Sequence, residues 1–169
     1  MIKQTMLAVI LSCTGLWGVN APVNNAEAIV EAKSGSSVSG KVTFKQEPKG
    51  VRIVADIKGL SPGLHGFHIH EKGDCSAHDA SSAGGHYNPY NKPHGGINSA
   101  ERHMGDFGNL VANSAGEAHY DELNDLVELN GEHSIIGKSI VIHADPDDLK
   151  TQPTGNSGSR IGCGEIKAK

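Results

Sequence analysis

The feature that most constrains this chain is a set of residues with metal-binding side chains, spread from position 68 to position 143. The set consists of His68, His70, His86, His94, His103, Asp106 and His143. Seven ligands cannot all bind one small ion. Three histidines with one more form a copper-like set, and three histidines with an aspartate form a zinc-like set. The residues supply both sets only if one of them binds both metals, and His86 is the candidate.

The composition indicates one β-rich domain. The chain has 169 residues, enough for one domain with a substantial core but not comfortably for two. Aromatic residues make up 4% and glycines number 22, which favours short strands and long ordered loops over a helical bundle. The formal net charge of −4 argues against a nucleic-acid partner. A lone histidine is usually a surface or core residue, and this interpretation holds for His78, His119 and His133.

Alternating apolar and polar residues, with turns rich in glycine and proline, predict short antiparallel strands. The expected strands cover about residues 38–44, 51–57, 64–70, 106–112, 117–120, 135–143 and 161–166. Such strands predict a sandwich or a flattened barrel. The segments 71–104 and 144–160 lack periodicity. Loops this long need an ordering element, and a metal or a disulfide would serve.

The expected elements suit metal binding. His68 and His70 lie two positions apart on one strand, so both side chains point to the same face and Ile69 points to the other. His143 ends another strand and can complete a site on that face. The remaining histidines come from the long loop, and Asp106 begins the next strand.

A shared His86 implies chemistry as well as structure. A histidine that binds metals through both ring nitrogens must lose both protons, and this imidazolate is stable only while two cations hold it. Reduction of the copper weakens its hold on the ring. The ring can then take up a proton and later donate it, while zinc keeps the ring aimed.

Two further residues are candidates for supporting roles. Asp147 lies four residues after His143 and can accept hydrogen bonds from ligand histidines at each site, or it can be a solvated loop carboxylate. Arg160 lies three residues before Cys163. If a disulfide ties Cys163 to the loop near the copper, Arg160 is held over the metal, where its guanidinium attracts a small anion. Without that geometry it is an ordinary surface arginine.

The N-terminus has the character of an export signal. Lys3 is the only early charge, and an apolar run over 6–11 follows it. Two motifs of small residues, which end at Ala21 and at Ala28, could be the site where the signal is cleaved. Pro22 disfavours cleavage after Ala21. We therefore expect residues 1–28 to be signal and lead-in, with a lead-in reaching about residue 32 and a single domain over 33–169. The apolar run is too short for a membrane span.

The cysteines fit export. Cys13 lies in the expected signal, where Ile10-Leu11-Ser12-Cys13 is an alternative lipoprotein cleavage box that would give a lipid-anchored form. Removal of the signal leaves Cys75 and Cys163, for which a single disulfide is the natural interpretation and two buried thiols the alternative.

At this point the sequence resembles the copper–zinc superoxide dismutases of the exported bacterial type, over about residues 36–167. The motifs that carry the resemblance are GLHGFHIH at 63–70, GGHYNP at 84–89, HGG at 94–96, ERHMGD at 101–106, IVIH at 140–143 and GNSGSRIGCG at 155–164. The resemblance implies an all-β Greek-key β-sandwich, or flattened eight-stranded barrel, with two long functional loops. It also implies dismutation of superoxide to dioxygen and hydrogen peroxide outside the cytoplasm, in the periplasm or as a secreted protein.

The resemblance also assigns roles by position. It implies one copper per subunit bound by His68, His70, His86 and His143, and one structural zinc bound by His86, His94, His103 and Asp106. Arg160 would guide the anion, and His65 resembles a buried histidine that supports the ligands. Cys75 matches the bacterial position of the disulfide cysteine. A homodimer and a monomer are both compatible with the sequence.

The sequence also departs from the family. The loop over 147–160 is shorter than in the cytosolic eukaryotic enzymes and lacks their glutamates and steering lysine, and Pro153 stands about where that lysine would be. Lys150 or Lys72 are candidate substitutes. Three rival functions are a copper store or delivery protein, a copper-only dismutase, and an interaction domain with incidental histidines. A copper store would not need Arg160 or a shared histidine, and the copper-only relatives lack the zinc set that is complete here.

Overall fold

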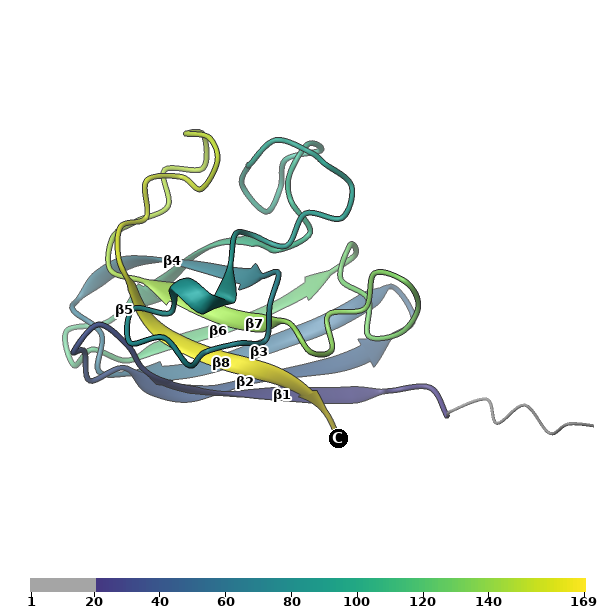
Figure 1. Ribbon diagram of the computed structural model, residues 1–169, viewed down its shortest axis with the longest axis horizontal. Helices are drawn as coiled ribbons and strands as arrows, with labels where there is room; N and C mark the ends of the chain where they lie inside the picture. Colours follow the sequence, from purple (N-terminus) through teal and green to yellow (C-terminus); the bar gives the residue numbers. More distant parts are fainter. Residues whose placement is uncertain (1–20) are drawn as a thin grey trace, which may run out of the picture.

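A computed structural model describes residues 21–169 and consists of eight strands and one short 3-10 helix (Figure 1). The elements are β1 (Asn25–Ala32), β2 (Ser39–Glu47), β3 (Gly50–Lys58), β4 (Gly63–His70), η1 (Ser81–Ala83), β5 (Asp106–Ala112), β6 (Ala118–Asn124), β7 (Ser139–His143) and β8 (Arg160–Ala168). The expected signal segment up to residue 20, including Cys13, lies outside the described residues. Among those described, no helix is long and apolar enough to cross a membrane.

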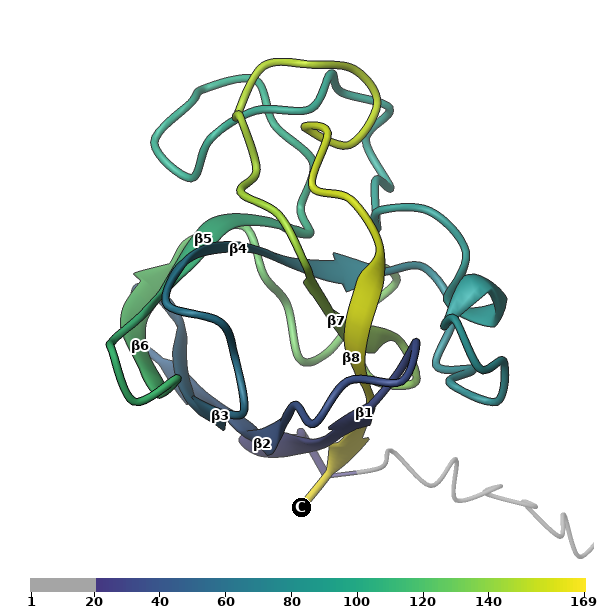
Figure 2. The same cartoon turned by 90° about the vertical axis from the view of Figure 1, so that its left-hand side faces the viewer.

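The strands form one antiparallel sheet in the order β5-β4-β7-β8-β1-β2-β3-β6. The sheet curls until its two edge strands, β5 and β6, lie side by side, so the barrel is nearly closed (Figure 2). The chain crosses the barrel between β3 and β4 and returns between β6 and β7, which gives a Greek-key arrangement. The all-β antiparallel fold expected from the sequence is confirmed.

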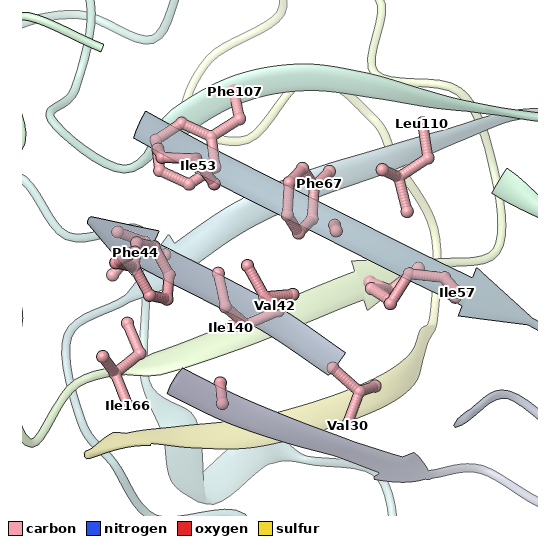
Figure 3. Close-up of a cluster of buried hydrophobic side chains, with 14 of the residues drawn as sticks. Val30, Val42, Phe44, Ile53, Ile57, Phe67, Phe107, Leu110, Ile140 and Ile166 are labelled. Carbon is pink, nitrogen blue, oxygen red and sulfur yellow. The ribbon is translucent and has the colours of Figure 1, made fainter. Parts of the chain in front are cut away.

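The barrel interior holds the apolar half of each alternating strand (Figure 3). Phe67 and Ile69 of β4 point inward and are completely buried, and the Phe67 ring lies 5.4 Å from that of Phe107. The alternation places His68 and His70 on the outer face of the same strand. They are nevertheless buried, because the loops after β4 and β7 fold over that face (Figure 2).

Two boundaries differ from the sequence-based expectation. Asn25–Ala32, expected to be signal and lead-in, forms β1 and pairs with both β2 and β8, so the barrel begins at Asn25 and not at residue 33. Its inward residues are small, Ala26 and Ala28 among them, which made the strand look like a cleavage region. β7 begins only at Ser139, because Gly137 adopts a φ of +77° and turns the chain before the strand starts.

Candidate metal centre

Four histidines meet on the outer face of β4. His68 and His70 come from β4, His143 ends β7, and His86 is brought alongside by an isolated antiparallel bridge to His70. One ring nitrogen of each lies within 4.8 Å of the others, and all four residues are buried.

The free ring nitrogens of this group fit a metal. Nδ1 of His68 and Nε2 of His70, His86 and His143 are buried and have no hydrogen-bond partner. The opposite nitrogens of two rings face carbonyls: His70 Nδ1 donates to Gly84 O at 2.9 Å, and His143 Nδ1 donates to Gly158 O at 3.3 Å. Each of these bonds leaves a lone pair on Nε2. Four unpaired buried nitrogens would be costly without a cation, and copper favours such an imidazole set.

A second group lies against the first, around the carboxylate of Asp106. Its Oδ1 is 2.9 Å from His86 Nδ1 and 3.2 Å from His103 Nδ1, and its Oδ2 is 3.0 Å from His94 Nδ1. The backbone N–H groups of Gly95 and His103 also donate to Oδ2 and fix the carboxylate. Three imidazole nitrogens and one carboxylate form the donor set that a closed zinc site uses.

His86 belongs to both groups. Its Nε2 faces the other three histidines of the first group, and its Nδ1 faces Asp106 in the second. Nδ1 also lies 3.4 Å from His103 Nδ1. The geometry is therefore that of one ring between two adjoining cation sites.

Asp147 contacts one histidine from each of the two groups. Its Oδ2 accepts from His68 Nε2 at 2.8 Å and its Oδ1 accepts from His94 Nε2 at 2.9 Å. His65 is buried as well, and its ring nitrogens lie 2.8 Å from His143 O and from Ser61 O. Both side chains thus contact residues of the two groups, whereas His78 and His119 are exposed and stand apart.

The electrostatics differ between the two groups in the absence of metal. Burial lowers the pKa of His86 to about 4 and that of His143 to about 3, and neighbouring histidines add to both shifts. Burial would also lower the pKa of His94, but hydrogen bonds to Asp106 and Asp147 outweigh it and raise this pKa to about 9. Burial would raise the pKa of Asp106, yet bonds from His103 and His86 hold it well below its usual range.

The Cys75–Cys163 disulfide links the first long loop to β8, with the two Cα atoms 5.8 Å apart. The disulfide expected from the sequence is therefore present. Arg160 begins β8 and donates from Nη1 to the carbonyl of Ala80 at 2.8 Å. Ala80 lies in the loop that the disulfide anchors and is completely buried. The guanidinium is thus tied to that loop, and β8 pairs Arg160 with His143.

Some contacts of the centre could not be assigned from the sequence, although Gly155 begins one of the motifs that carry the resemblance. Gln152 lies in the second long loop, residues 144–159, between β7 and β8. Its side-chain amide hydrogen-bonds to the backbone N–H and C=O of His94. Gly155 has a φ of +70° and packs directly against Asp147 and His94. A glycine and a glutamine in an irregular loop carry no periodic signal, so spacing could not have found them.

The fold and the centre together define a class: an antiparallel barrel with two adjoining groups of buried side chains that could hold metal ions, under two long loops. Known proteins agree with this class. The family model for copper/zinc superoxide dismutase (SODC) matches residues 38–166. The chain belongs to the copper/zinc superoxide dismutase family.

Relatives and a solved structure are similar along most of the chain. An extracellular superoxide dismutase [Cu-Zn] of Brugia pahangi is 45% identical over 83% of this chain and 74% of the relative. A superoxide dismutase [Cu-Zn] of Onchocerca volvulus is 45% identical over 84% of this chain and 94% of the relative. Superoxide dismutase [Cu-Zn] 3 of Arabidopsis thaliana is 43% identical over 88% of this chain and 94% of the relative. A crystal structure of the clock protein EA4 superimposes with a TM-score of 0.81 at 38% identity. The match covers 88% of this chain and 97% of the EA4 chain.

Proposed function

We propose that this chain dismutates superoxide with copper held by His68, His70, His86 and His143 and zinc held by His86, His94, His103 and Asp106. Two superoxide ions and two protons give one dioxygen and one hydrogen peroxide. The observation that carries the proposal is the single ring of His86, which turns one nitrogen to each group. Bound copper supplies the one-electron redox chemistry, and bound zinc a fixed positive charge.

The protein's own residues orient the histidine rings, attract the superoxide anion and move a proton. The carbonyls of Gly84 and Gly158 hold the rings of His70 and His143 with Nε2 facing the site. Nε2 of His86 is the atom at which the chain can hold a proton and release it to the product. Arg160, tied to Ala80 O, offers a fixed positive charge to a small anion.

Arg160 and the shared ring separate this function from a copper store. A store needs ligands but neither a fixed guanidinium nor a histidine with two metals. The test loads both metals into wild type, Arg160→Ala and His86→Ala, verifies metal content, and measures dismutation by stopped flow at several ionic strengths. Arg52→Ala is the matched control, because Arg52 pairs with Asp121 at the surface.

We expect both test variants to lose activity and the control to keep it. The wild-type rate should fall as salt rises, since salt screens the attraction of the anion. Full dismutation in both His86→Ala and Arg160→Ala would contradict the roles of these two residues, and a metal-loaded wild type without dismutation would leave a metal store as the better explanation.

We also propose that the chain is exported and that its signal is cleaved before β1. Cleavage after Ala28 would remove the first half of β1, which pairs Asn25 with Lys45 and Ala28 with Val42. The disulfide and the extracellular relative support export. Mass spectrometry of the exported protein tests the site: a mature N-terminus ahead of Asn25 is expected, one at Ile29 contradicts it, and a lipidated Cys13 would indicate a membrane anchor.

The finer assignment to the bacterial periplasmic type belongs to the same proposal. It is supported by the position of Cys75 and by the short second loop. The relatives described above are eukaryotic and bear on the family and on export. Fractionation of the source cells tests the location, and sedimentation of the metal-loaded protein decides between a homodimer and a monomer.

A further inference from the structure

The side chain of Gln152 binds the main chain of His94 across the two long loops. Gln152 Oε1 accepts from the N–H of His94 at 2.7 Å, and Gln152 Nε2 donates to the carbonyl of His94 at 2.9 Å. The same Nε2 lies 3.2 Å from Lys150 O. One amide therefore satisfies both backbone groups of a residue 58 positions away, as a neighbouring strand would.

His94 needs such a partner because no strand holds it. It lies in the irregular segment between β4 and β5, yet its ring is fully buried between Asp106 and Asp147. The two carboxylates fix the ring, and they leave the N–H and C=O of the backbone without a strand partner. The amide of Gln152 fixes the backbone to which the ring is attached.

The second loop approaches His94 so closely that one of its positions has to be glycine. A Cβ on Gly155 would overlap Oδ1 of Asp147 and lie 2.7 Å from Nε2 of His94. The loop is therefore packed on the His94 ring by Gly155 while Gln152 grips the backbone. Both contacts come from the segment that follows Asp147.

We propose that Gln152 is a positioning residue for His94, through which the second loop sets the zinc affinity of the centre. The inference rests on the proposed function, in which His94 binds zinc. Groups that orient a metal ligand contribute strongly to metal affinity, and loss of one costs about 10–100-fold. The effect on zinc should exceed that on copper, because Gln152 contacts no backbone of the copper ligands among the hydrogen bonds of residues 21–169.

The test measures zinc binding to the metal-free, disulfide-intact protein by competition with a chromogenic chelator. Gln152→Ala removes the amide, and Gln152→Met keeps the side-chain length without its hydrogen bonds. Thr154→Ala is the matched control, a change in the same loop at a side chain that makes no hydrogen bond within residues 21–169. We expect both Gln152 variants to raise the zinc Kd about tenfold and the control to leave it unchanged.

A second readout reports geometry. Cobalt(II) bound in the zinc site should show an altered visible spectrum in both Gln152 variants and an unchanged one in Thr154→Ala. A wild-type Kd and spectrum in Gln152→Met would overturn the proposal, because packing alone would then suffice. Neither measurement involves copper or superoxide, so this failure is distinct from loss of the proposed function, which the stopped-flow assay reports.

Discussion

Nε2 of His68 lies 2.8 Å from Oδ2 of Asp147, although 79 positions separate the two residues in the sequence. The other oxygen of Asp147 accepts from His94 at 2.9 Å. One buried carboxylate thus orients a ring in each of the two histidine groups, and both ring contacts depend on its acceptor character.

Asp147→Asn should therefore weaken both sites. An asparagine amide has one acceptor and one donor, so one of the two ring N–H groups would face a donor. We expect the affinity for zinc and for copper to fall about 10–100-fold, as for other groups that orient metal ligands. Chelator competition measures both. Asp148→Asn is the control, because Asp148 bonds to Thr151 in its own loop; equal behaviour of the two variants would contradict the role of Asp147.

Gly155→Ala should destabilise the protein more than Gly137→Ala. Both glycines have a positive φ, +70° and +77°, so either alanine costs about 1–2 kcal/mol in backbone conformation. Only at Gly155 does the new Cβ overlap Asp147, since nothing lies within 4 Å of a Cβ at Gly137. Denaturant unfolding of both variants gives the comparison. Equal losses would mean that the second loop can move away from the metal centre.

Loss of the disulfide should lower stability and loosen Arg160. The bond closes a span of 88 residues, and removal of a native disulfide costs about 2–5 kcal/mol. Cys75→Ser with Cys163→Ser tests this by denaturant unfolding. Because the disulfide anchors the loop that contains Ala80, dismutation by the metal-loaded double variant should also fall. Unchanged stability would mean that the bonds of Lys33 and Ser34 to this region suffice to hold it.

The metal-free protein should lose stability in acid through His86 and His143. Their folded-state pKa values, about 4 and about 3, lie below the unfolded value of about 6.5. The unfolded chain therefore binds protons first, and this contribution is complete above pH 6.5 and declines as the pH falls toward 4. His94 has the opposite sign: its pKa of about 9 is raised, so its contribution is complete below 6.5 and declines as the pH rises through 9.

Ring titrations followed by NMR in metal-free protein check these values. His94 should remain charged at pH 8 and His86 should remain neutral at pH 5. The outcome that contradicts the prediction is titration of both rings near 6.5, which would mean that the metal-free centre is open to water.

The strands, and the shared face of His68 and His70 on β4, could be predicted because both depend on periodicity. Alternation along residues 64–70 places Phe67 inside the barrel and His68 outside, and no other register buries the apolar residues. β1 escaped prediction because its inward residues are mainly alanines, which bury little surface and resemble a signal cleavage site.

The contacts between the two long loops could not be predicted in the same way. Asp147 could be proposed from its short distance in sequence from His143. Gln152 meets His94 only because both loops fold onto one face of the barrel, and such a meeting leaves no regular trace in either segment. Irregular backbone is specified by individual contacts, so each has to be seen in three dimensions.

Arg160→Lys should separate the charge of Arg160 from its geometry. Arg160 donates to Ala80 O at 2.8 Å, which holds the planar guanidinium in one orientation. Lysine keeps the positive charge but cannot present a fixed fork of donors. We expect dismutation to fall about tenfold in Arg160→Ala, with a weaker salt dependence, because the attraction of the anion is lost. Arg160→Lys should keep the salt dependence of wild type and lie between the two in rate. Stopped-flow rates at low and high ionic strength measure both properties. A lysine variant as fast as wild type would show that charge alone is required, and one as slow as the alanine variant would show that orientation by Ala80 dominates.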